Sequence, residues 1–212
     1  MTSSESQSSL TMVDSNAMLD RYSLREKLNN YLDLLIAENQ RINLVSRETS
    51  RDGLMRLAIE SLAPLSIESL YALIFKAATY LDIGSGGGLP AIPLLLVRPE
   101  MRTVLYERRQ KKARALQRIA RELGIVADVM AVDFESDVLL DAKYDLITIR
   151  YVPLIEKILN KCISVIAPGG ALLYYGSIED ISKNSKWRAS ECCYRVTDSQ
   201  EPQHLTVLTP SP

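Results

Sequence analysis

The sequence is poor in the residues that build disulfide frameworks and metal sites. Its 212 residues include three cysteines, of which Cys192 and Cys193 are adjacent, and a single histidine, His204. This spacing provides neither a ladder of disulfide partners nor a Cys-x-x-Cys metal motif. We therefore expect reduced thiols in a cytoplasmic protein, and no metal site.

Long apolar runs and an excess of one charge are also missing. No apolar run approaches the roughly 18 residues that a membrane span needs, so we expect no membrane partner. The 25 basic and 26 acidic residues give a formal net charge of −1, so no global electrostatic field points to a nucleic-acid partner. The serine-rich start lacks the basic and apolar regions of a signal peptide, which predicts a disordered leader over residues 1–19.

The rest of the chain, residues 20–212, is expected to form one α/β domain. Apolar residues at helical spacing predict helices over 20–38, after Asp52 and over 66–76, and these form a helical cap that ends at residue 77. Strands and helices then alternate over 78–212, which favours a Rossmann-like, mostly parallel sheet with helices on both faces. We predict seven strands, the last two an antiparallel pair at the sheet edge, over residues 79–83, 102–107, 127–132, 144–149, 171–175, 192–196 and 204–208.

The most informative segment is YLDIGSGGGLP, residues 80–90. A short apolar strand runs into a turn with Gly84, Gly86 and Gly88, and a helix that starts with proline follows. Positions without a Cβ let the backbone pass close beneath a ligand, and a helix start offers free N–H groups and a positive dipole end. The dinucleotide fingerprint is incomplete, because Leu89 occupies its third glycine position. With an acid two residues before the first glycine, the spacing instead resembles motif I of the class I S-adenosylmethionine-dependent methyltransferases.

Acidic residues follow the next two predicted strands. Glu107 ends the second strand, 21 residues after Gly86, where a carboxylate can accept hydrogen bonds from both hydroxyls of a ribose. The third strand runs into Asp133, Phe134 and Glu135, which could hold an adenine through carboxylates and a ring face. Two alternatives stay open. The glycines followed by Glu107 could be an ordinary glycine-rich turn with an acid further along the chain. Asp133 and Glu135 could be ordinary acids that cap the next turn.

Basic residues border the same predicted site. The strand over 144–149 delivers Arg150 to its rim. The predicted helix from Arg108 to Leu123 carries seven cations, which can be an ordinary solvated face or a local patch that binds phosphates. These cations are Arg108, Arg109, Lys111, Lys112, Arg114, Arg118 and Arg121.

Together these segments resemble the 16S ribosomal RNA (guanine-N7) methyltransferases, also called the glucose-inhibited division protein B family. The resemblance covers about residues 25–208 and rests on INLVS, RLAIESL, LDIGSGGGLPAIPL, KKARALQRIARELGI, DFES and QHLTVL. It implies cofactor contacts at Gly84, Leu89, Phe134, Glu135 and Arg150. With Gly86, Gly88, Glu107 and Asp133, these residues form the candidate S-adenosylmethionine site, and Arg150, which would also shape the base pocket, is the candidate catalytic residue.

The resemblance implies methyl transfer from S-adenosylmethionine to N7 of a guanine in 16S ribosomal RNA, either free or within the 30S subunit. Guanine N7 has an in-plane lone pair and no proton, so its attack needs no general base. We expect a monomer. Asn43 and Arg56 are candidate contacts to the acceptor, although Arg56 is equally well interpreted as a surface charge.

The acceptor side departs from the family pattern at several positions, with Glu60 in place of an aspartate and Ile149 in place of a serine among them. Leu57 stands in place of a histidine, Tyr151 in place of an alanine and Tyr175 in place of a lysine. Two other hypotheses therefore stay open. The protein could methylate a small molecule, or it could bind the cofactor without transferring a methyl group and act through RNA or protein binding.

Overall fold

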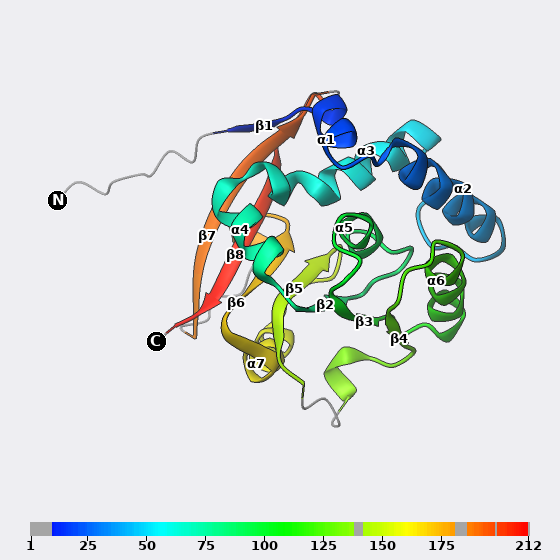
Figure 1. Cartoon of the computed structure of the whole chain (residues 1–212). Helices are drawn as coiled ribbons and strands as arrows, with labels where there is room; N and C mark the ends of the chain where they lie inside the picture. Colours follow the sequence, from blue (N-terminus) through cyan, green and yellow to red (C-terminus); the bar gives the residue numbers. More distant parts are fainter. Residues whose placement is uncertain (1–9, 138–141, 181–185, 198, 212) are drawn as a thin grey trace.

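An eight-stranded sheet, in the order β1-β7-β8-β6-β5-β2-β3-β4, forms the centre of the computed structural model (Figure 1). The structure describes residues 10–137, 142–180, 186–197 and 199–211. Five of the seven strand pairings are parallel, and β8 runs antiparallel to both β6 and β7. The strands are β1 (Thr11–Val13), β2 (Thr79–Ile83), β3 (Arg102–Tyr106), β4 (Asp128–Met130), β5 (Tyr144–Arg150), β6 (Ile166–Tyr175), β7 (Trp187–Val196) and β8 (Gln203–Pro210). The predicted Rossmann-like, mostly parallel α/β sheet is thus confirmed.

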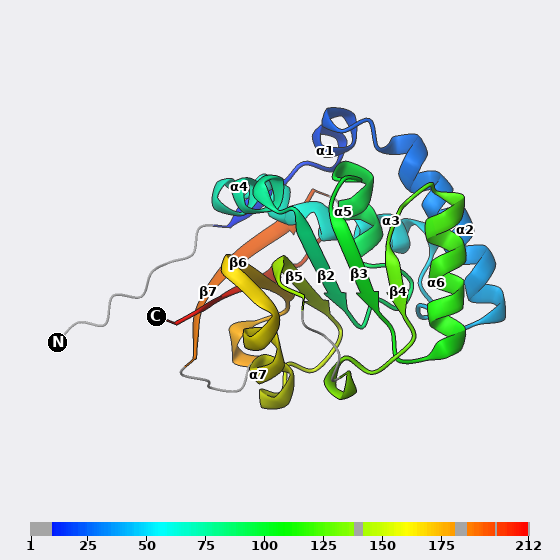
Figure 2. The same ribbon diagram turned by 60° about the horizontal axis from the view of Figure 1, so that its bottom comes forward.

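Helices cover both faces of this sheet. In Figure 2, α4 and α5 lie above the sheet and α7 lies below it. Within the described residues the helices are α1 (Ser15–Arg21), α2 (Arg25–Arg41), α3 (Arg51–Leu62), α4 (Glu68–Lys76), α5 (Ala91–Val97), α6 (Gln110–Glu122) and α7 (Glu156–Val165), with short 3-10 turns η1 (Ala63–Ser66), η2 (Phe134–Ser136) and η3 (Ile178–Asp180). Helices α1 to α4 form the N-terminal cap.

Alternate residues of the central strands pack into two hydrophobic clusters. In β2, Tyr80 packs with the cluster that holds the cap, α5 and α6, whereas Leu81 and Ile83 pack with the cluster that holds α7. In β5, Leu146 and Ile147 divide in the same way. Successive side chains of a strand point to opposite faces, so this division buries both faces of the sheet and explains the near-continuous apolar runs of its strands.

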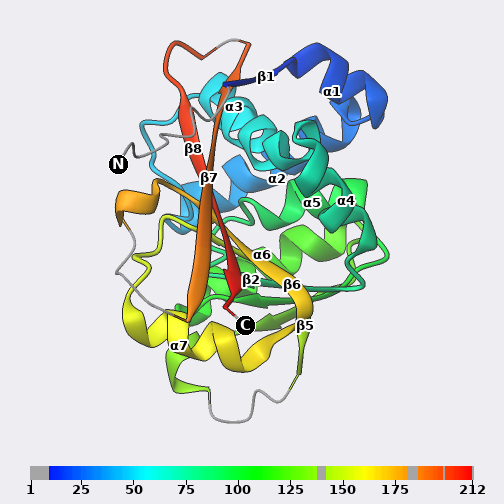
Figure 3. The ribbon, with the colours of Figure 1, turned by 90° about the vertical axis from the view of Figure 1, so that its left-hand side faces the viewer.

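The N-terminal segment differs from the prediction. Residues 11–13 of the expected leader form β1, which pairs in parallel with β7 (Figure 3). Asp14 then caps α1 by accepting hydrogen bonds from the N–H groups of Asn16 and Ala17 at 2.9 and 3.0 Å. The sheet therefore has eight strands instead of seven, and β1 rather than the β7–β8 pair forms the edge opposite β4. Three residues are too few to show strand alternation, which is why the sequence did not indicate β1. Residues 1–9 lie outside the described residues.

The first predicted helix, over 20–38, is two helices in the structure. Ser23 lies between α1 and α2 with a φ of 52°, a left-handed conformation that a helix cannot continue through. Helix α2 is tied to α6 by a bidentate ion pair, in which Arg118 donates to both carboxylate oxygens of Glu38 at 2.8 and 2.6 Å. Arg118 is thus paired between two helices although its side chain stays partly exposed, unlike an unpaired cation of a solvated face.

No single helix among the described residues is long and apolar enough to cross a membrane. Helix α3 with η1 and helix α4 would be long and apolar enough only if taken together, and a bend of 95° separates them.

A buried chain of polar groups joins β2 to β5. The hydroxyls of Tyr80 and Thr148 lie 2.7 Å apart, and Thr148 donates to Asp82 Oδ1 at 2.5 Å. Asp82 is 1 % exposed, and its Oδ2 has no hydrogen-bond partner among the described residues. Burial raises the pKa of Asp82 to about 6, although its hydrogen bonds oppose this, because an apolar surrounding disfavours the charged carboxylate.

The raised pKa of Asp82 predicts a pH-dependent stability difference from an Asp82→Asn variant. An acid whose pKa is raised in the folded state stabilises the fold when the pH is below the pKa of the unfolded state. This stabilisation is lost as the pH rises through the pKa of the folded state. Two pKa units correspond to about 3 kcal/mol. Urea titrations from pH 4 to pH 7 should show the wild type losing about this much free energy of unfolding relative to the variant. A difference that does not change with pH would contradict the assignment.

Candidate functional site

The turn after β2 is fastened to the end of β3. The N–H groups of Gly84 and Ser85 both donate to the carbonyl of Tyr106, at 2.8 and 2.9 Å. Gly84 has a φ of 79°, and a Cβ at this position would come within 2.3 Å of Val152 Cγ2. Only glycine meets both conditions. The sequence pattern thus produces a tight turn at the carboxyl end of the parallel strands, where ligands bind in open α/β sheets.

Glu107, the residue after β3, holds the same turn with its side chain. Its Oε2 accepts a hydrogen bond from the N–H of Gly86 at 3.1 Å, and its Oε1 accepts one from the N–H of Arg109 at 2.8 Å. Glu107 is only 7 % exposed. Each carboxylate oxygen can accept a further hydrogen bond, so the group remains able to bind a ligand hydroxyl.

A cavity of about 830 Å³ opens beside this turn, between the cap and the ends of β2, β3 and β5. Its size lies within the range of small-molecule and cofactor sites. All but one of the predicted cofactor residues line it. The lining members of that set are Gly84, Gly86, Leu89, Glu107, Asp133, Phe134, Glu135 and Arg150.

Gly88 is the exception, since it does not line this cavity. A Cβ at Gly88 would lie 2.4 Å from Ile92 Cγ1 and 3.1 Å from Leu116 Cδ1, so the residue permits α5 and α6 to pack closely. The start of α5 also offers fewer N–H groups than expected. Pro90 and Pro93 have no N–H group, and that of Ile92 donates to the Gly88 carbonyl at 2.7 Å.

Phe134 and its neighbours close the far end of the cavity. Phe134 is 4 % exposed, and its ring meets that of Tyr106 edge-on, with centroids 5.3 Å apart. Lys161 lies 4.8 Å from the Phe134 ring centroid and donates to the Phe134 carbonyl. Asp133 Oδ1 accepts a hydrogen bond from the N–H of Glu135 at 3.1 Å. One oxygen of Asp133 therefore caps a turn, as the alternative interpretation proposed.

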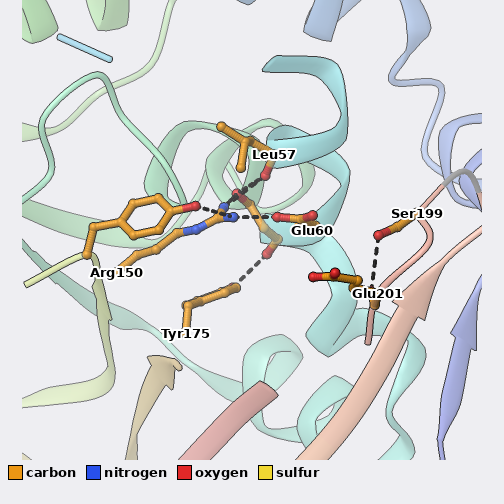
Figure 4. Close-up of polar contacts among 8 residues, drawn as sticks. Leu57, Glu60, Arg150, Tyr175, Ser199 and Glu201 are labelled. Carbon is orange, nitrogen blue, oxygen red and sulfur yellow. Dashed lines mark hydrogen bonds and ion pairs between the residues drawn. The ribbon is translucent and has the colours of Figure 1, made fainter. Parts of the chain in front are cut away.

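Arg150 extends from the end of β5 toward the cap helix α3 (Figure 4). Its Nη2 lies 2.5 Å from Glu60 Oε2, and its Nη1 donates to the Leu57 carbonyl at 3.0 Å and to Ser61 Oγ at 3.1 Å. The Arg150 and Glu60 side chains are 4 % and 7 % exposed. A buried charge pair must be well hydrogen-bonded to offset its desolvation, and these contacts provide that.

Three of the positions that were expected to depart from the family pattern, Leu57, Tyr151 and Tyr175, surround the Arg150 guanidinium. Leu57 offers its backbone carbonyl, while the rings of Tyr151 and Tyr175 lie with centroids 5.0 and 5.5 Å from the Arg150 Cζ. The Tyr175 hydroxyl donates to the Ser61 carbonyl at 2.7 Å. Tyr151 and Tyr175 therefore form one rebuilt cluster around Arg150, whereas the Leu57 side chain is not explained by its backbone contact.

Some cavity residues were not predicted. Asn39 Oδ1 accepts the N–H groups of Leu44 and Val45 at 2.7 and 3.0 Å, which holds the loop after α2 against the cavity. Lys112 also lines the cavity, and burial lowers its pKa although the charge of Glu107 opposes this. Helical spacing places Lys112 on a charged face, so no pattern in the sequence separates it from its neighbours. The INLVS string was the only sequence signal for the loop.

The two candidate acceptor contacts lie in different places. Asn43 lines the large cavity. Arg56 is exposed and lines a second, smaller cavity beside it.

The single histidine lies beside a cysteine and an acid, on the strand pair β7–β8. His204 Nδ1 is 3.6 Å from Cys193 Sγ and 3.3 Å from Glu191 Oε1, and the three ligand atoms lie within 4.8 Å of one another. No sequence pattern indicates this grouping, because the register of β7 and β8 brings residues 193 and 204 together. The expected absence of a metal site stays a prediction.

The fold and the turn after β2 define the class: the chain has the class I S-adenosylmethionine-dependent methyltransferase fold. Two solved structures illustrate the likeness. The O-methyltransferase TomG from Streptomyces achromogenes, in complex with SAM, has a TM-score of 0.57 and 16% identity, covering 86% of this chain and 90% of that chain. An O-methyltransferase from Bacillus cereus, in complex with SAH, has a TM-score of 0.58 and 15% identity, covering 84% and 90%.

Within that class, the chain belongs to the GidB family, described as rRNA small subunit methyltransferase G, whose model matches residues 24–204. The ribosomal RNA small subunit methyltransferase G of Solibacter usitatus is 31% identical over 145 residues, which are 68% of this chain and 66% of that protein. The protein of the same name from Staphylococcus epidermidis strain RP62A is 29% identical over 153 residues, 70% and 62% of the two chains. The chain thus spans slightly less than two thirds of these relatives.

The Arg150–Glu60 pair predicts how substitutions at Arg150 act. Arg150→Ala leaves the Glu60 carboxylate buried without its partner charge, so the free energy of unfolding should fall by about 3–5 kcal/mol. Replacing both partners with apolar residues, Arg150→Met with Glu60→Leu, should recover most of that loss. Urea denaturation of the three proteins checks this. A loss below about 1 kcal/mol in Arg150→Ala would contradict the described pairing.

Proposed function

We propose that this protein transfers a methyl group from S-adenosylmethionine to N7 of a guanine in small-subunit (16S) ribosomal RNA. The observation that carries the proposal is the buried Glu107 carboxylate, which faces the large cavity while it holds the glycine turn. Family membership supports the ribosomal RNA acceptor.

The residues of the large cavity fit this cofactor. Glu107 has acceptor capacity for the ribose hydroxyls, and the turn over Gly84–Gly87 leaves room for the methionine part. Asp133, Glu135 and the Phe134 ring surround the space expected for the adenine. Lys112, which lines the same cavity, adds a polar group to this set.

When bound, S-adenosylmethionine supplies an electrophilic methyl group on a sulfonium sulfur. The chain's own task is to position the acceptor, since guanine N7 has no proton for a side chain to remove. Holding two reactants in line is worth roughly 7–11 kcal/mol of barrier. Arg150 fits a positioning role, because its hydrogen bonds fix α3 of the cap against the rim of the cavity.

Exposed cations near the cavity support an RNA acceptor. Arg108 and Arg109 line the cavity, and Lys111 and Arg114 are exposed on α6, which follows them. Such a local patch can hold phosphates although the net charge is near zero. A small-molecule acceptor is the second candidate, and the rebuilt cluster around Arg150 favours it.

Nucleoside analysis of ribosomal RNA tests this function. Small-subunit RNA from cells with and without the gene is digested, and 7-methylguanosine is measured by mass spectrometry. We expect one 7-methylguanosine per molecule to disappear with the gene, and to return when purified protein and S-adenosylmethionine are added to the unmethylated RNA or 30S subunits. An unchanged 7-methylguanosine content would overturn the proposal. Methylation of small acceptors alone would select the second candidate.

A further inference from the structure

A second cavity of about 520 Å³ adjoins the large one. The two share three lining residues, Thr49, Leu57 and Tyr151, so these side chains form the boundary between them. A methyl group passes directly from donor to acceptor, so an acceptor atom must reach the donor across such a boundary. The second cavity is therefore suitably placed to receive the acceptor.

Tyr151 has an unusual conformation at this boundary. Ile149 and Arg150, which precede it, are buried, yet Tyr151 is 77 % exposed. Its φ is 56°, in the left-handed region that a bulky residue rarely adopts. Strained backbone conformations persist only where contacts with the surrounding structure hold them in place, and they are frequent at functional sites. The Tyr151 ring is held in place by the Arg150 guanidinium, whose Cζ lies 5.0 Å from its centroid and whose Nη2 is 3.5 Å from its hydroxyl.

The rest of the second cavity is polar. Arg56 and Glu60 come from α3. Gln200 and Glu201 come from the segment that leads into β8, and Gln203 is the first residue of β8. Ser199 Oγ donates to the Glu201 carbonyl at 3.1 Å, which shapes this segment (Figure 4). A flipped base is typically read by stacking on an aromatic ring and by hydrogen bonds to its Watson–Crick edge. A carboxylate such as that of Glu201 can accept from the N1–H and N2–H groups of guanine.

We propose that the second cavity is the acceptor-base pocket, in which an unpaired guanine stacks on Tyr151 with its Watson–Crick edge toward Glu201. This inference rests on the proposed function and deepens it. It also gives a reason for the departure at position 151, since a tyrosine supplies a stacking face that an alanine lacks.

Steady-state methylation of unmethylated small-subunit RNA tests the pocket, with Tyr151→Ala, Tyr151→Phe and Glu201→Gln compared with the wild type. Loss of base stacking, or of hydrogen bonds to a carboxylate, each weakens binding by about 10- to 100-fold. We expect kcat/KM for RNA to fall by about that factor in Tyr151→Ala and in Glu201→Gln, and to stay within about threefold in Tyr151→Phe. Calorimetry should show unchanged affinity for S-adenosylmethionine in all three, which also verifies folding.

A matched control is Glu26→Gln, which removes an exposed carboxylate on α2 away from both cavities and should behave as the wild type. An active wild type with an unimpaired Tyr151→Ala variant would overturn the pocket alone. Loss of cofactor affinity in Tyr151→Ala would also overturn it, by assigning Tyr151 to the donor cavity. A wild type that does not methylate RNA would overturn the proposed function, and the pocket with it.

Discussion

The site depends on how the end of β3 holds the turn after β2. The Tyr106 carbonyl accepts two N–H groups of the turn, and the Glu107 carboxylate accepts a third from Gly86 and a fourth from Arg109 at the start of α6. Two adjacent residues thus fix the turn, the neighbouring strand end and the following helix relative to one another. A carboxylate already oriented by two backbone N–H groups needs little reorganisation to bind a ligand hydroxyl, which is the advantage of preorganisation.

The cap forms the second wall of the site through the Arg150–Glu60 pair. This pair and its hydrogen bonds are buried, so moving the cap away from the sheet rim would break the ion pair and leave two charges without partners. The same guanidinium supports the Tyr151 ring at the boundary of the two cavities. Arg150, which is expected to touch the cofactor, lines the large cavity and is also bound to the protein around it. Leu57, Tyr151 and Tyr175 all lie at this guanidinium.

The sequence predicted the central strands and most of the cavity lining well, for clear physical reasons. Strands such as β2 and β5 are buried on both faces and therefore read as continuous apolar runs, and an acid at a strand end can only lie at the sheet rim. Features that depend on long-range contacts were missed. Strand β1 depends on pairing with β7, and the engagement of Arg118 depends on Glu38 in another helix. Gly88 was assigned to the ligand because spacing alone cannot separate a turn glycine from a packing glycine.

The central claim is that the large cavity binds S-adenosylmethionine through the Glu107 carboxylate. Calorimetric titration of the wild type and of Glu107→Ala with S-adenosylmethionine tests it most directly, with far-UV circular dichroism to verify that the variant is folded. The account predicts one site per chain in the wild type and an affinity about 10- to 100-fold lower in the folded variant, as expected for lost hydrogen bonds to a charged group. Equal affinities in the two proteins, or no binding to the wild type, would contradict it.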